Sequence, residues 1–161
     1  MFERFFSCQR TIGAYVEGLG LLALRLWAGY EFLMAGLIKL QDLTQPEWFV
    51  SLTFPFPHTL LSAHANWVAA GVLESVLGTT LLLGLFSRWS SAALLYVTYV
   101  AVYTVHFDLG WQGWNQIDTE QGLGFKVPLM LALMLWTVLT QGAGRFSLDH
   151  LRHTRRGHLL P

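Results

Sequence analysis

Four long apolar runs, each largely free of charged residues, constrain this chain more than any other feature of its sequence. They cover residues 14–40, 63–86, 89–107 and 123–141. A helix needs about 20 mainly apolar residues, each rising about 1.5 Å, to cross a hydrocarbon core about 30 Å thick. Because 53% of the 161 residues are hydrophobic and 12% are charged, the composition lies outside the usual balance of a soluble domain. The sequence therefore predicts an all-α integral membrane protein, a four-helix bundle that forms a single domain over residues 1–161.

The distribution of basic residues predicts how this bundle is oriented. Lys and Arg near span ends are retained on the cytoplasmic side of the membrane. One set of connections and tails carries Arg4, Arg10, Arg88, Arg145, Arg152, Arg155 and Arg156. The opposite set carries Asp42, Glu47, Asp108, Asp118 and Glu120, with Lys39 and Lys126 at the span ends. Both termini are therefore expected to be cytoplasmic, and the basic tail from residue 145 is expected to contact anionic membrane lipid.

Several classes of function find no support in the sequence. A formal net charge of zero offers no footprint for nucleic acid. The single cysteine, Cys8, excludes an intramolecular disulfide and a cysteine-based metal cluster. Met34, Met130 and Met134 could hold Cu(I), but methionines at helical spacing usually fill a core, so no metal site is predicted. Phosphate-binding glycine loops, Gly-x-Ser-x-Gly and His-Glu-x-x-His are absent from the sequence, so independent catalysis is not expected.

Charged residues inside the predicted spans are the main functional clue. Arg25 and Glu31 lie in the first run and Glu74 lies near the middle of the second. An unpaired charge at such a depth costs a few kcal/mol or more, so these side chains need partners. Counting from the ends of the runs predicts an Arg25–Glu74 ion pair in the dry interior. This pair either holds the first two helices together or forms part of a ligand site.

A stripe of polar-tipped side chains follows one face of the third run. It consists of Tyr96, Tyr99, Tyr103 and His106, at offsets of three, four and three. The stripe either packs against neighbouring helices or lines a pocket for a ring-shaped ligand such as a quinone head group. Lys39, Asp108 and Lys126 are expected at the depth of His106, where they would form an outward-open polar pocket.

The longer connections carry aromatic residues and prolines. The segment 41–62 contains three prolines and four large aromatic residues, which favours an extended or interfacial segment lying on the bundle. Trp111 and Trp114 in the second long connection are typical of anchors at the membrane interface. The turn of residues 85–89 is so short that the second and third helices must be antiparallel neighbours.

The residues resemble the DoxX family of small four-helix bacterial membrane proteins. The resemblance rests on Arg25-Leu26 followed by Gly29, Phe32, Gly36 and Lys39, on Glu74 followed by Leu-Leu-Leu-Gly-Leu-Phe-Ser-Arg up to Arg88, and on His106 at the end of the third run. Arg25, Lys39, Glu74, Arg88 and His106 match polar positions of the family. The closing residues 141–151 are similar to members encoded with copper-binding-peptide maturation proteins.

The resemblance implies an accessory role in the bacterial inner membrane. Some relatives are subunits of quinone-linked sulfur oxidation, and others belong to oxidative-stress or peptide-modification assemblies. The favoured hypothesis is a membrane subunit that positions a quinone or another small apolar ligand for protein partners of a redox or peptide-maturation system. One alternative is a carrier for protons or a small solute, for which the small size of the chain favours a homo-oligomer. The other is a non-catalytic membrane anchor for soluble partners.

Overall fold

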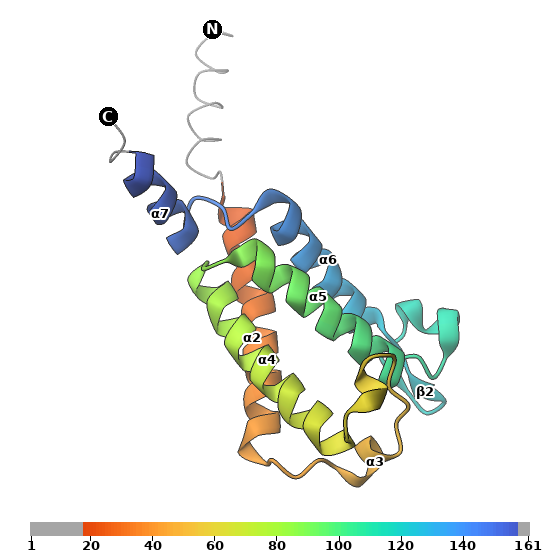
Figure 1. The fold of residues 1–161 in the computed structure, drawn as a ribbon. Coiled ribbons are helices and arrows are strands. Elements are labelled where there is room, and N and C mark those ends of the chain that lie inside the picture. The colour runs from red at the N-terminus through yellow and green to blue at the C-terminus, as the bar shows by residue number, and fades with distance from the viewer. Residues whose placement is uncertain (1–17, 158–161) are drawn as a thin grey trace, which may run out of the picture.

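The computed structural model describes residues 18–157, without the side chains of Asp118 and of residues 153–157. Four long helices dominate it: α2 (Leu19–Gln41), α4 (Ala63–Leu83), α5 (Ser87–Thr104) and α6 (Lys126–Gln141) (Figure 1). The shorter elements are α3 (Glu47–Val50), η1 (His58–Leu60), η2 (Gly110–Asn115), the antiparallel strands β1 (Asp118–Thr119) and β2 (Gly122–Leu123), and α7 (Leu148–Gly157). Each predicted run thus forms one long helix, with ends shifted by a few residues. The predicted first turn at residues 14–17, Cys8, Arg4 and Arg10 lie outside the described residues.

Two of the four helices are candidate membrane spans by length and composition. They are α2, with 23 residues, and α4, with 21. Helix α6 is apolar but has 16 residues, and α5 has 18 residues that begin with the polar sequence Ser-Arg-Trp-Ser-Ser. Large apolar side chains also face outward, as in Trp27 (60% exposed) and Ile38 (61%) of α2 and Val76 (56%) of α4. Such surfaces suit a lipid environment better than water.

Glycines let α2 and α4 approach each other closely. A Cβ atom placed on Gly36 would lie 2.5 Å from the backbone N of Ser75, and one placed on Gly78 would lie 2.7 Å from the backbone N of Leu33. These distances leave no room for a side chain at either position. Small residues are the usual means of close helix contact in membranes, so the glycines set the register of this pair.

Enlarging one of these glycines is expected to destabilise the protein. Gly36→Ala should lower the free energy of unfolding by about 1–3 kcal/mol, because an added methyl group must push α2 away from α4. Gly20→Ala is the matched control: it lies in the same helix, and a Cβ there would meet nothing within 4 Å. Unfolding of both variants in detergent micelles measures the difference. Equal stability of the two variants would contradict the close contact.

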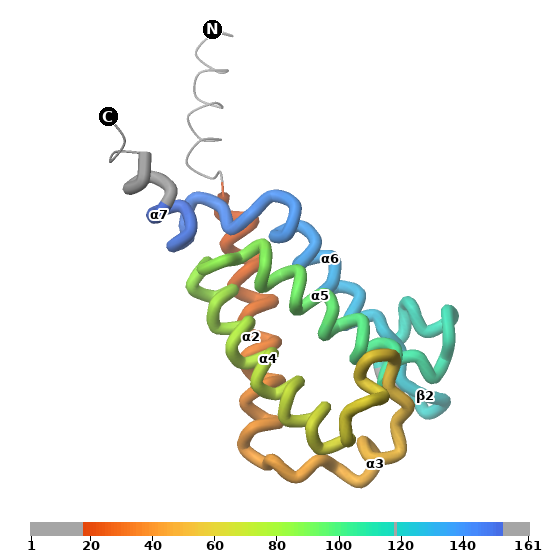
Figure 2. Tube along the Cα trace, in the orientation of Figure 1, coloured from red at the N-terminus to blue at the C-terminus, as the bar shows by residue number. Residues whose placement is uncertain are grey.

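The helices form two pairs that diverge from a shared end. Helix α2 packs mainly on α4 and α5 mainly on α6, and α4 contacts α5 as the short turn predicts. We call the end that holds the α4–α5 turn the turn end, and the end that holds segments 42–62 and 105–125 the loop end. Figures 1 and 2 show α4 and α5 close together at the turn end and separated at the loop end, where segment 42–62 with α3 lies between them.

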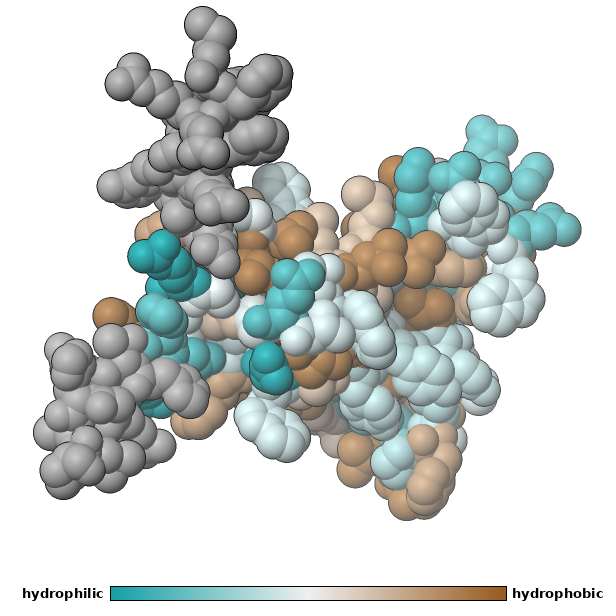
Figure 3. All heavy atoms as spheres, turned by 90° about the horizontal axis from the view of Figure 1, so that it is seen from above, coloured by the Kyte–Doolittle hydropathy of each residue, from teal (hydrophilic) through white to brown (hydrophobic). Residues whose placement is uncertain are grey.

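An apolar core joins the four helices between the two ends. Its buried members are Ala28, Phe32, Leu81, Leu94, Leu135 and Val138. Viewed from above, hydrophilic residues gather beside the grey segments and again at the opposite side of the molecule, while much of the surface between is apolar or intermediate in hydropathy (Figure 3). Trp111 (80% exposed) and Trp114 (57%) project from η2, consistent with the predicted interface anchors.

Candidate functional site

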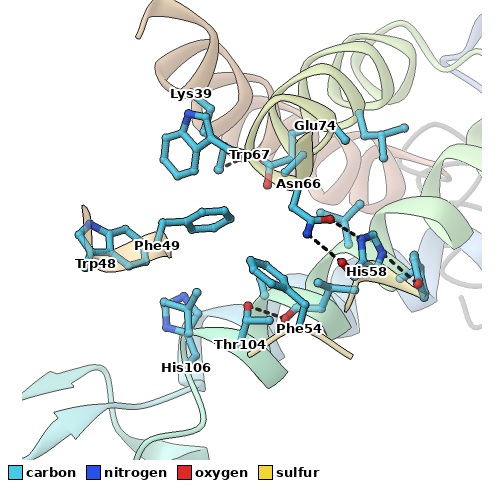
Figure 4. A pocket seen from close by; sticks show the side chains of 18 residues that line it. Lys39, Trp48, Phe49, Phe54, His58, Asn66, Trp67, Glu74, Thr104 and His106 are labelled. Carbon is cyan, nitrogen blue, oxygen red and sulfur yellow. Dashed lines mark hydrogen bonds and ion pairs between the residues drawn. The ribbon is translucent and has the colours of Figure 1, made fainter. Parts of the chain in front are cut away.

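A cavity of about 220 Å³ lies between α4 and α5 at the loop end. The aromatic residues of segment 42–62, which was predicted to lie on the bundle, form one side of this cavity. Phe49, Phe54 and Trp67 are directed at the enclosed space in Figure 4, with Trp48 and His106 beside it. Phe49 is 7% exposed and holds the segment in place through edge contacts with Phe54 and Trp67 at centroid distances of 5.3 and 4.9 Å.

An ion pair between Lys39 and Glu74 lies in the wall of the cavity. Lys39 Nζ donates to Glu74 Oε2 at 2.7 Å. Glu74 is 6% exposed, and the ammonium group lies 5.8 Å from the ring centroid of Trp67, a cation–π distance. Lys39 is in the last turn of α2, and the close contact at Gly36 brings this turn to the level of Glu74. The pair is therefore electrically neutral as a unit, with one strong donor and one strong acceptor at the cavity.

Hydrogen bonds among His58, Asn66 and Tyr96 link segment 42–62 to α4 and α5, the two helices that flank the cavity. Asn66 Nδ2 donates to His58 O at 3.0 Å, so Asn66 Oδ1 is the acceptor that lies 2.9 Å from His58 Nδ1. His58 Nε2 lies 3.1 Å from the hydroxyl oxygen of Tyr96, also within hydrogen-bond distance. These hydrogen bonds position Tyr96 at the cavity wall and anchor η1 against α4 and α5.

The structure brings four of the predicted ligand-binding residues to this cavity. They are Lys39, Glu74, Tyr96 and His106. The Tyr96–Tyr99 and Tyr99–Tyr103 ring centroids are each 6.3 Å apart, which confirms that the tyrosines share one stripe. Tyr99 and Tyr103 nevertheless do not line the cavity, and they are 54% and 51% exposed on the outer face of α5. Glu31, half-buried on α2, and Lys126, the first residue of α6, also lie outside its lining.

The predicted Arg25–Glu74 ion pair is wrong. Arg25 is 2% exposed and donates from Nη1 to Ala143 O at 2.9 Å and from Nη2 to Phe146 O at 2.7 Å. These carbonyls belong to the segment after α6, at the turn end, whereas Glu74 pairs with Lys39. Arg25 and Lys39 are fourteen positions apart, which is about 21 Å along α2. Counting from run ends failed because α4 continues beyond the end of α2, which shifts Glu74 toward the loop end.

His58 and Asn66 are polar cavity residues that the sequence did not single out. His58 follows a proline in a segment without periodicity, and Asn66 lies in the first turn of α4 among alanines. Neither pattern marks a site. Their only sequence signal is proximity, because Asn66 lies eight residues after His58, a separation that allows the chain to turn back on itself.

The lining combines aromatic side chains with groups that can form hydrogen bonds to the oxygen substituents of an uncharged ring. Lys39 can donate to a ligand carbonyl, and Glu74 can accept from a ligand hydroxyl. Among the side chains that the structure describes, no group of three or more His, Cys, Asp or Glu is suited to a metal ion.

Two comparisons with known proteins found a match to this chain. The DoxX family model matches residues 20–107, a range that includes every residue lining the cavity. The chain is also 36% identical over 137 residues to an uncharacterized protein of Haemophilus influenzae, and the alignment covers 84% of each chain. No solved structure matches the chain. The likeness of residues 141–151 to copper-peptide members stays a prediction. The match to the family model confirms the resemblance seen in the sequence: this membrane protein belongs to the DoxX family.

Proposed function

We propose that the protein is an accessory subunit of the bacterial inner membrane that holds a quinone head group, or a similar small ring with oxygen substituents, for a partner redox protein. The observation that carries this proposal is the cavity at the loop end, where aromatic walls surround the Lys39–Glu74 pair. Ligand sites of proteins typically combine an apolar lining with a few placed polar groups.

The size and chemistry of the cavity support a single substituted ring. A dry cavity of about 150 Å³ holds one benzene molecule, and this cavity has about 220 Å³. A quinone carbonyl accepts a hydrogen bond, and the hydroxyl of the reduced form donates one. Lys39 and Glu74 together offer both functions, so the same wall can bind either redox form. Leu73, which lines the cavity and is 43% exposed, provides an apolar rim for an attached hydrocarbon tail.

In this proposal the four long helices all span the membrane with the turn end in the cytoplasm. Helices α5 and α6, with 18 and 16 residues, are about 27 and 24 Å long. Such lengths span a core of about 30 Å with local thinning of the bilayer or snorkelling at the ends. Support for the orientation comes from Arg88, Arg145 and Arg152 at the turn end and Asp42 and Asp108 at the loop end.

The apolar core favours a binding subunit over a carrier. A path for protons or solutes would have to run from the cavity to the turn end. Phe32, Leu81 and Leu94 lie between the two and are at most 7% exposed. A simple anchor, in turn, has no need for a buried ion pair at a cavity. We therefore place the ligand-binding proposal ahead of both alternatives.

Filling the cavity is expected to weaken ligand binding. Titration of the purified protein with a ubiquinone that carries one isoprene unit should quench tryptophan fluorescence saturably, because Trp48 and Trp67 line the cavity. Ala70→Phe should weaken this binding about tenfold or more, since overpacking costs about 1–3 kcal/mol. Val76→Phe is the matched control, because it adds a ring to an exposed face of the same helix.

Two results would contradict the proposal. One is quenching that never saturates in the wild-type protein, and the other is equal binding by Ala70→Phe and Val76→Phe. An organic extract of the protein purified from its native membrane, analysed by mass spectrometry, provides an independent check. It should contain quinone in proportion to protein, and the extract of Ala70→Phe should be depleted.

A further inference from the structure

A second hollow, of about 620 Å³, lies at the turn end and is open to the surroundings. It is formed by the first residues of α5, the end of α6 and the segment that leads into α7. Its lining is mostly polar, unlike that of the cavity at the loop end, and it includes Ser87, Arg88, Arg145 and Asp149. From this hollow we infer a binding site for a phosphate group carried by the headgroup of an anionic lipid.

The cationic side of the hollow depends mainly on Arg88. In the part of the chain that the structure describes, its guanidinium makes one hydrogen bond, a long one of 3.4 Å from Nη2 to Thr140 O. A guanidinium has five N–H donors in a planar fork that matches the geometry of a phosphate. The guanidinium lies over Gly142, where an added Cβ would be 3.5 Å from Arg88 Nε. Arg145 contributes a second positive charge to the same lining.

The one carboxylate of the lining is already engaged. Asp149 Oδ1 accepts from Phe86 N, and Asp149 Oδ2 accepts from Ser87 N, both at 2.9 Å. Asp149 therefore caps the N-terminus of α5, where the helix dipole offsets its negative charge. Its two bonds hold the segment after α6 against the α4–α5 turn, so this carboxylate forms the frame of the hollow.

An unsatisfied hydroxyl provides independent evidence for a ligand. Ser87 lines the hollow and is 1% exposed, and its Oγ has no hydrogen-bond partner among residues 18–157. A buried hydroxyl without a partner costs about 1–3 kcal/mol, so native proteins rarely leave one unpaired. A phosphate oxygen that enters the hollow as far as this hydroxyl would supply the missing acceptor.

The neighbouring aromatic side chains favour a lipid as the source of the phosphate. Phe86 and Trp89 also line the hollow, and they are 60% and 78% exposed. A tryptophan with an exposed ring beside cationic residues is typical of the headgroup layer of a membrane. A phosphate there would come with acyl chains that can pack on these rings. This inference rests on the membrane orientation proposed above but not on the ring ligand.

The test compares lipids that differ in charge. Delipidated protein in neutral detergent is titrated with dioleoyl phosphatidylglycerol, dioleoyl phosphatidylethanolamine or inorganic phosphate, and the bound fraction is measured by native mass spectrometry. We expect phosphatidylglycerol to bind more tightly than phosphatidylethanolamine. Arg88→Gln should weaken phosphatidylglycerol binding about tenfold, the loss expected when a charged hydrogen-bond partner is removed. Ser87→Ala should also weaken phosphatidylglycerol binding. Loss of the hydroxyl should not destabilise the free protein, because within the described part of the chain this hydroxyl is buried without a partner.

The control is Arg152→Gln, which removes a positive charge from the same end of the molecule but not from the lining of the hollow. If Arg152→Gln and Arg88→Gln lost equal affinity for phosphatidylglycerol, the site would be overturned, because general electrostatic attraction to this end of the molecule would then explain the binding. Equal binding of the two lipids would also overturn it. Displacement of phosphatidylglycerol by millimolar inorganic phosphate would overturn the lipid assignment. Quinone binding, measured on the same variants, should be unchanged, so failure here is distinguishable from failure of the proposed function.

Discussion

Replacing Lys39 with methionine is expected to lower the free energy of unfolding by about 3–5 kcal/mol, the cost of leaving a buried charge without its partner. Glu74 is 6% exposed, and its Oε2 accepts from Lys39 Nζ at 2.7 Å. The methionine keeps most of the packing volume of the lysine stem but cannot donate. The loss should appear as a reduced denaturant midpoint in detergent micelles, monitored by circular dichroism.

A second substitution shows how much of the lost stability comes from the unpaired charge and how much from altered packing. In the double variant Lys39→Met with Glu74→Gln, the buried charge is gone, so most of the lost stability should return. Lys126→Met is the matched control, because within residues 18–157 Lys126 forms no ion pair, and it should change stability little. If Lys39→Met with Glu74→Gln were as unstable as Lys39→Met, the ion pair would not be the source of the effect.

Replacing Arg25 with methionine is expected to release the segment after α6 and to cost about 3 kcal/mol. Arg25 donates two hydrogen bonds, to Ala143 O and Phe146 O, and a charged hydrogen bond contributes about 1.5–3 kcal/mol. Both acceptors lose their partner, because the methionine cannot replace the guanidinium. Limited trypsin digestion should then cut after Arg145 more rapidly than in the wild type, whereas the cavity at the loop end should still bind its ligand.

Asp149→Asn tests whether release of the segment after α6 is specific to the loss of Arg25. Asp149 holds the same segment from the other side, through Phe86 N and Ser87 N. Its amide variant should retain one acceptor oxygen and loosen the segment less than Arg25→Met does. Unchanged proteolysis in Arg25→Met would show that the two carbonyl bonds do not hold the segment. Loss of quinone binding in that variant would show that the two ends of the molecule are coupled, against the separation described here.

The sequence predicted the helices well and the site only in part. The apolar runs placed α2, α4, α5 and α6 because long apolar stretches have few other stable forms. The stripe of Tyr96, Tyr99 and Tyr103 followed from helical spacing, which is a local property. Spacing within one helix does not say which part of a stripe meets another element, so Tyr96 reached the cavity while the other two stayed on the outer face.

By itself, the sequence determined the helical class, the four apolar segments and the need of Arg25 and Glu74 for partners. Only the tertiary structure decided which partner each of these two charges has. The pairing depends on how far α4 is shifted along α2, which the close contacts of Gly36 and Gly78 set. With this shift, Glu74 lies beside Lys39, whereas Arg25 lies beside two backbone carbonyls. The reason is physical: partners within a helix are fixed by its 3.6-residue period, whereas partners between helices depend on how side chains far apart in the sequence pack.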